Sequence, residues 1–137
     1  MSAPKIERSV AEAHVKEWAD RLGFDLQELP GDVVRAEMDG RIIFDESAET
    51  FLIRLRKPIE RENGKQIEEL LISEPTAKQI ADSSKGTSDQ MAITIRLLSA
   101  MSGQPVSIID RLRLRDLMLS AGILSFFALP AEKPSSG

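Results

Sequence analysis

The residues whose types could support catalysis are few, and their spacing does not favour it. Two carboxylate pairs, Asp45-Glu46 and Glu68-Glu69, occur in segments with the alternating pattern of strands. Adjacent side chains on a strand point to opposite faces, so neither pair can share one proton as a general acid and base. The single histidine, His14, lies at the margin of an apolar stripe, where a packed or hydrogen-bonded role is usual. These residues predict a protein that is not an enzyme.

The composition narrows the chemistry further. The 137-residue chain has no cysteine, no tyrosine and one histidine, which excludes a disulfide framework, a thiolate metal site and a cysteine nucleophile. No glycine-rich phosphate loop, G-x-S-x-G or H-E-x-x-H motif occurs, so we expect neither a cofactor nor a metal ion. No stretch approaches the roughly 18 apolar residues of a membrane span, and the N-terminus lacks an apolar signal region. We therefore expect a cytoplasmic protein without membrane contact.

Charge is distributed unevenly along the chain. The net charge is −4, but residues 1–49 carry 6 basic and 12 acidic side chains, whereas residues 50–137 carry 12 and 10. An acidic chain lacks the positive field that holds phosphate backbones, so nucleic acid is not an expected partner. The change near residue 50 predicts an acidic N-terminal extension over 1–49, a core over 50–128 and a disordered polar tail over 129–137.

Helix starts are marked by capping-box spacing, in which Ser or Thr is followed three residues later by Glu or Gln. The spacing occurs at Ser9 and Glu12, at Thr76 and Gln79, and at Thr87 and Gln90. It predicts helices over 9–23, 76–86 and 87–103, each ended by a glycine. Met91, Ile95, Leu98 and Met101 would form the inner face of the third helix. A last helix over 111–127, or two short ones broken at Gly122, follows.

Two Asx-Gly dipeptides predict β-hairpins, because a tight turn requires positive φ angles. Asp39-Gly40 would turn a hairpin over 33–46, and Asn63-Gly64 one over 50–73. A two-residue turn at Asn63-Gly64 would place Leu55 opposite Ile72. One face would then carry Phe51, Ile53, Leu55, Leu70 and Ile72, and the other Arg54 and Arg56 among Leu52, Ile67 and Leu71. The second face suits a partly covered sheet or a surface for a partner.

The expected fold is an α+β domain. Two antiparallel hairpins form or contribute to one small sheet, and about three C-terminal helices pack on its apolar face. The N-terminal helix covers an edge or the remaining face. Pro75, which cannot donate to a strand ladder, explains the abrupt change from strand to helix in "LISEPTAKQI".

The segment from Leu112 to Phe127 is apolar around the whole helix, so one buried stripe does not account for it. One interpretation is a central core helix. The other is that part of it is exposed to a second subunit or a partner helix. The candidate residues for that exposed site are Leu119, Ile123, Phe126 and Phe127. The arginines of "RLRLR", beside Asp110 and Asp116, are interpreted as a solvated face rather than a nucleic-acid patch.

Four stretches carry a resemblance to a known family: "LRKPI" at 55–59, "LLISEPTAKQI" at 70–80, "LLSAMSGQP" at 97–105 and "IIDRLRLRDLMLSAG" at 108–122. In this order the chain from about residue 50 to 127 resembles the tail assembly chaperones of Mu-like and P2-like contractile-tailed phages. The resemblance implies a protein of the host bacterial cytoplasm, encoded by a phage or prophage. Such a protein binds the tape measure protein while the tail tube is polymerised and is absent from the mature virion.

In many such phages a translational frameshift gives a longer product, which is thought to recruit tail tube protein, and "LPAEKPSSG" is where the two products would diverge. The role is compatible with a homo-oligomer. It needs exposed apolar side chains, so Met118 becomes a further partner-binding candidate, and Arg54 and Arg56 are candidates for the rim. Two alternatives stay open: a minor structural or tail-completion component of the virion, and a helix-turn-helix regulator over residues 87–127.

Overall fold

The computed structural model describes residues 6–24 and 28–127, and the tail predicted over 129–137 lies outside them. In chain order the elements are α1 (Arg8–Leu22), α2 (Gly31–Met38), β1 (Ile42–Asp45), β2 (Thr50–Glu60), β3 (Gln66–Ser73), α3 (Ala77–Ser83), α4 (Gln90–Ser102), α5 (Val106–Ile109) and α6 (Leu114–Leu124). The predicted α+β class is confirmed.

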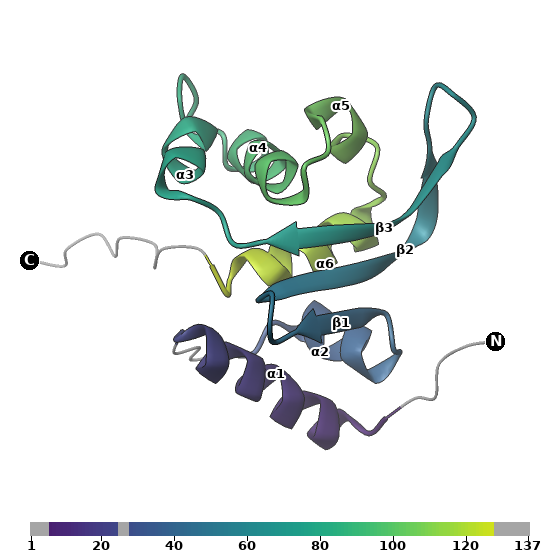
Figure 1. Cartoon of the computed structure of the whole chain (residues 1–137), viewed down its shortest axis with the longest axis vertical. Helices are drawn as coiled ribbons and strands as arrows, with labels where there is room; N and C mark the ends of the chain where they lie inside the picture. Colours follow the sequence, from purple (N-terminus) through teal and green to yellow (C-terminus); the bar gives the residue numbers. More distant parts are fainter. Residues whose placement is uncertain (1–5, 25–27, 128–137) are drawn as a thin grey trace, which may run out of the picture.

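The strands form one antiparallel sheet in the order β1-β2-β3. In Figure 1, α1 and α2 lie beside β1, α3 to α5 lie beyond β3, and α6 passes behind the strands. Helix α6 packs against β2 and α2, while α4 packs against β3. The N-terminal helices and the C-terminal helices therefore meet on one side of the same sheet.

Helix starts follow the predicted capping boxes in one case of three. Thr76 accepts from the Gln79 backbone N–H at 3.1 Å and its own N–H donates to the Gln79 side chain at 2.9 Å, which confirms that box. The other two are wrong. Helix α1 begins one residue before Ser9, with Glu7 at the N-cap and no side-chain cap. Asp89, rather than Thr87, caps α4 by accepting from a backbone N–H.

The hairpin predicted over 33–46 is wrong, because residues 31–38 form α2. Gly40 does adopt a positive φ of 71°, but it ends the helix: the Arg41 N–H donates to the Ala36 carbonyl at 2.8 Å. An Asp-Gly pair satisfies the C-terminus of a helix as readily as a tight turn. The buried side chains Val33, Val34 and Ala36 hold α2 against the core.

The hairpin over 50–73 is confirmed, but its register differs from the predicted one. Phe51, rather than Leu55, lies opposite Ile72. From Arg54 to Ile59, β2 advances five positions while β3 advances two, from Glu69 to Ile67, so the extra residues form a bulge. The offset from the predicted register at Phe51 is an even number of residues, and the predicted face is buried as a set: Phe51, Ile53, Leu55, Leu70 and Ile72.

The core is centred on Phe51, whose ring contacts aromatic side chains from both ends of the chain. Its centroid lies 5.8 Å from that of Trp18, 4.9 Å from Phe44, 5.2 Å from Phe126 and 5.8 Å from Phe127. Buried residues of α1, α2, β1 and α6 belong to the same cluster. Residues 1–49 therefore contribute directly to the core through their described part. Met91, predicted on the inner face of α4, is instead 51% exposed.

Candidate partner-binding surface

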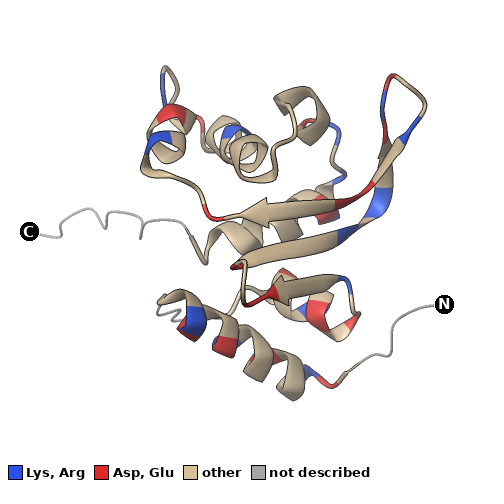
Figure 2. Cartoon of the chain, viewed as in Figure 1, with Lys and Arg blue, Asp and Glu red and all other residues tan. Residues whose placement is uncertain are grey.

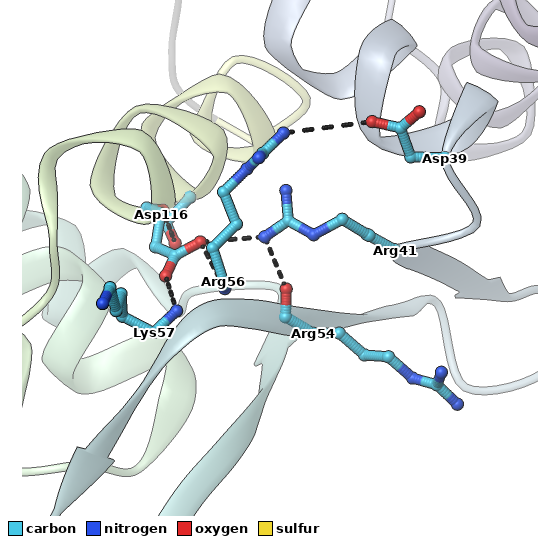
Figure 3. Close-up of polar contacts among 7 residues, drawn as sticks. Asp39, Arg41, Arg54, Arg56, Lys57 and Asp116 are labelled. Carbon is cyan, nitrogen blue, oxygen red and sulfur yellow. Dashed lines mark hydrogen bonds and ion pairs between the residues drawn. The ribbon is translucent and has the colours of Figure 1, made fainter. Parts of the chain in front are cut away.

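A buried carboxylate fixes the start of α6 against the bulge of β2. Asp116 is 1% exposed and accepts hydrogen bonds from the backbone N–H groups of Arg56 at 3.0 Å and Lys57 at 3.2 Å (Figure 3). These are N–H groups of the bulge, where the ladder with β3 is interrupted. Satisfying both with one carboxylate removes the cost of burying unpaired donors.

The same carboxylate is paired with a guanidinium from the beginning of the sheet. The Arg41 Nη2 atom lies 2.9 Å from Asp116 Oδ1 and also donates to the Arg54 carbonyl at 2.8 Å. The Arg56 side chain extends toward Asp39, with 3.9 Å between their charged atoms (Figure 3). The arrangement holds α6, β2 and the residue before β1 in one fixed geometry.

This junction lies at the side of a groove of about 400 Å³ between α2 and α6. Two apolar side chains of α6 are exposed in it: Leu114 at 69% and Met118 at 48%. They are four residues apart and so lie on one face of the helix. The other lining residues are Asp32, Arg35, Ala36, Arg41, Arg56, Arg115 and Leu119.

Cations predominate around these two apolar side chains. A second hollow adjoins the groove and shares Arg56, Leu114 and Arg115 with it. It adds Lys57, Arg113 and the buried Asp116. Arg41 and Arg56 are in ion pairs, but Arg35, Lys57, Arg113 and Arg115 make none within residues 6–24 and 28–127. Figure 2 shows basic positions along the outer half of β2 and the connection from α5 to α6. We call Leu114, Met118, Arg35, Arg56, Lys57, Arg113 and Arg115 the basic groove.

A second exposed feature lies on the sheet itself. Ile43 pairs with Leu52, and Leu52 pairs with Leu71, so these side chains form a row across all three strands. Ile43 is 53% and Leu71 51% exposed. Arg54 and Glu69, at 3.8 Å, flank the row as an exposed ion pair. This row is apolar with a balanced charge beside it, in contrast to the basic groove.

The candidates predicted from sequence divide between these surfaces and the core. Met118 and Arg56 line the basic groove, while Arg54 lies on the sheet face and points away from Asp116 (Figure 3). Bulge geometry separates the two arginines, which simple alternation would place in one environment. Partner binding by these three residues stays a prediction.

The expectation that part of the last helix is exposed is wrong for four side chains. They are buried, because α2, β2 and the N-terminal aromatic residues cover the helix on several sides. The residues concerned are Leu119, Ile123, Phe126 and Phe127. The core-helix interpretation accounts for them, and α6 continues through Gly122 without a break.

The residues that sequence reasoning missed lie in "RLRLR" and in α2. Arg113 and Arg115 are exposed as expected, but Asp116 beside them is buried rather than solvated. Leu114, between two arginines at the helix start, carried a usable signal: it falls outside the apolar spacing of Leu119 and Ile123. No sequence signal indicated Arg35, because its segment was predicted to be a strand of a hairpin rather than a helix facing the groove.

His14 and the carboxylates show no arrangement for metal binding. The His14 Nδ1 atom lies 2.7 Å from Glu37 Oε2, which joins α1 to α2. Across the described ranges, no group of three or more His, Cys, Asp or Glu residues is placed to hold a metal ion. In the same part of the chain, no helix has the length and apolar content to cross a bilayer.

Comparison with known proteins identifies the family. A family model described as phage tail assembly chaperone proteins, E, or 41 or 14, matches residues 52–128, a little over half of the chain. The match covers β2, β3, α3 to α6 and the α6 wall of the basic groove. No curated protein and no solved structure gives a match. The chain belongs to the phage tail assembly chaperone family.

Proposed function

We propose that this chaperone binds the tape measure protein of a contractile-tailed phage or prophage while the tail tube is assembled, and that it is absent from the mature virion. The match of residues 52–128 to the tail assembly chaperone family carries this proposal. The basic groove supplies the kind of surface the role requires. Leu114 and Met118 offer exposed apolar contacts on a rigid helix, and methionine adapts to varied partner side chains.

We further propose that the protein acts by binding alone. Arginine remains protonated at neutral pH, and the leucine and methionine side chains carry no nucleophile or acid. The one buried carboxylate beside the groove, Asp116, is engaged by a guanidinium and two backbone N–H groups. Its hydrogen bonds serve the fold and support no catalytic role.

Three finer features of the role are part of the proposal. The protein works in the host cytoplasm, where tails are assembled. It forms homo-oligomers along a long client. A frameshifted longer form, diverging within "LPAEKPSSG", recruits the tail tube protein. The family match ends at residue 128, so such an extension would leave the matched segment intact.

The test is co-expression with the tape measure protein encoded in the same phage genome, with an affinity tag on the chaperone. We expect the tape measure protein to become soluble and to co-purify, because a chaperone shields the apolar surface of its client. An unrelated tagged cytosolic protein, expressed at the same level, is the control. Mass spectrometry of purified phage particles provides the second measurement and should find the tail tube protein but not the chaperone. No co-purification, together with the chain's presence in particles, would favour the tail-component alternative.

A further inference from the structure

We infer that the basic groove takes an acidic amphipathic helix: a segment with apolar side chains at three- and four-residue steps flanked by aspartate or glutamate. This inference deepens the proposed function, because it specifies the chemistry of the client segment. Three observations carry it: the spacing of two apolar side chains, the excess of cations around them, and the rigid support beneath both.

The apolar contacts have helical spacing. Leu114 and Met118 are one turn apart on α6 and are exposed at 69% and 48%. The groove places them opposite α2, so a ligand that buries both must lie between the two helices. An amphipathic helix fits such a groove, because its own apolar residues recur at the same interval.

The cations around the two apolar side chains favour aspartate and glutamate at the polar positions of the bound helix. Arg35 on α2, Lys57 on β2, and Arg113 and Arg115 at the start of α6 make no ion pair within the described ranges. They reach the apolar pair from three different elements. Two acidic residues line the groove and the adjoining hollow: Asp32, and Asp116, which is buried and paired with Arg41. Carboxylates flanking an apolar stripe would pair with these cations, and cationic segments would be repelled.

The support beneath the groove is rigid, which favours binding without rearrangement. Asp116 fixes the first turn of α6 to the bulge of β2, where Arg56 and Lys57 lie. Gly122 allows α2 to approach α6 closely, because a Cβ atom there would lie 3.1 Å from Val33 Cγ2. Both walls are therefore held by buried contacts, and little conformational entropy is lost when a ligand docks.

Single-stranded nucleic acid is the competing ligand for a cationic surface. It would use aromatic side chains for stacking, but the lining of the groove and of the adjoining hollow contains leucine and methionine and no aromatic residue. An acidic protein helix satisfies the apolar and the charged parts of the groove together.

The test measures binding of labelled probes to the full chain by fluorescence anisotropy. One probe is a helical peptide of about 20 residues with leucines at three- and four-residue steps and glutamates elsewhere. The second probe is a matched peptide with lysine in place of each glutamate, and the third is an oligodeoxynucleotide. We expect the acidic peptide to bind at least about tenfold more tightly than the lysine peptide, because the cations of the groove repel lysine side chains. Its affinity should fall as salt rises from about 0.05 to 0.5 M.

Matched variants locate the contact. Met118→Ser should weaken binding of the acidic peptide by about tenfold. Met91 is a comparably exposed methionine on α4, and Met91→Ser should leave the affinity unchanged. The double variant Arg35→Gln with Arg115→Gln should weaken binding and flatten its salt dependence. Arg8→Gln with Arg21→Gln removes the same charge from α1, where both arginines form exposed ion pairs, and should leave binding unchanged. Circular dichroism spectra and melting temperatures verify that all variants remain folded.

The outcomes separate this inference from the proposed function. Equal binding of the two peptides, equal effects of groove and control variants, or stronger binding of the oligodeoxynucleotide would each overturn it. If the tape measure protein still co-purifies with the Met118 and arginine variants, the chaperone role stands and the groove is not its contact. If the acidic peptide binds the groove but the tape measure protein does not co-purify, the proposed client is wrong and the groove chemistry stands.

Discussion

The Asp116 carboxylate lies 2.9 Å from the Arg41 guanidinium, although 75 positions separate the two residues in the chain. Arg41 is 19% and Asp116 1% exposed at the side chain, so this pair is largely removed from water. Because Asp116 also accepts from two backbone N–H groups, its charge is compensated from three directions.

Replacing Asp116 by asparagine should destabilise the fold by about 2–3 kcal/mol, because the amide NH₂ group cannot accept from the Lys57 backbone N–H and the Arg41 guanidinium loses its negatively charged partner. Urea denaturation monitored by circular dichroism measures this. Asp110→Asn is the matched control, since Asp110 is exposed, and should change stability by less than about 0.5 kcal/mol. Equal values for the two variants would show that Asp116 has no special structural role.

Phe51→Ala should be among the most destabilising single substitutions, at about 3–5 kcal/mol, because it leaves a cavity among four aromatic rings. Leu71→Ala removes an apolar side chain from the next strand, but one that is 51% exposed, and should cost less than about 1 kcal/mol. Thermal unfolding of both variants tests this. A comparable loss in Leu71→Ala would indicate that the open sheet face is covered in solution.

The capping boxes give a paired test of local structure. Thr76→Ala should cost about 1 kcal/mol, because the hydroxyl accepts the Gln79 N–H at the start of α3. Ser9→Ala should be neutral to within about 0.5 kcal/mol, since Ser9 lies inside α1 and makes no cap. Denaturant midpoints decide between these values. A large loss at Ser9 would contradict the observed start of α1.

The turn between β1 and β2 should make a pH-dependent contribution to the free energy of unfolding, through the carboxyl group of Asp45. A backbone hydrogen bond from Ala48, followed by those from the Ser47 side chain and backbone, lowers the pKa of Asp45 below 3.8. A carboxyl group with a lowered pKa stabilises the folded state fully at pH values above its pKa in the unfolded chain. This stabilisation is lost as the pH falls through its pKa in the folded protein. Carboxyl NMR titration measures the pKa directly. In Ser47→Ala the pKa should move back toward 3.8, and an unchanged value would contradict this cause.

Gly122→Val should destabilise the fold by about 1–3 kcal/mol and weaken binding in the groove, because the branched side chain would separate α2 from α6. Gly122→Ala should have a smaller effect, since a Cβ atom 3.1 Å from Val33 needs only a small shift and alanine favours the helix. Stability and peptide affinity are measured on the same preparations. An unchanged affinity in Gly122→Val would show that the groove tolerates a wider separation of its walls.

The features predicted correctly from sequence depend on neighbouring residues. The Thr76 box joins residues three positions apart, and alternation correctly places the predicted buried face from Phe51 to Leu55 and from Leu70 to Ile72. Alternation was wrong for Ile67, which it placed on the other face and which is buried because the bulge shifts the register. The hairpin over 33–46 was predicted wrongly because a positive φ at Gly40 suits both a turn and a helix end. Burial of α2 against α6 decides between them, and that contact joins distant segments.

The candidate site was the harder part for the same reason. Asp116 reads as a surface residue among arginines, and only its partners 59 to 75 positions away identify it as buried. The sequence left Phe126 and Phe127 open between the core and an exposed site, because the aromatic residues that cover them, Phe24 and Phe51, come from earlier segments. Sequence spacing reports local periodicity and carries no information about which distant segment fills the space opposite.

The two walls of the groove relate differently to the segment that the family model matches. Helix α6 belongs to the segment 52–128 matched by the family model, whereas α2 precedes it. Positions 32 and 35 on α2 are exposed, so changing them alters the charge of the groove without disturbing a buried side chain or any residue of the matched segment. The matched segment supplies both exposed apolar side chains and most of the cations of the groove, so substitutions at positions 32 and 35 would adjust the charge around an apolar contact that the family segment itself provides.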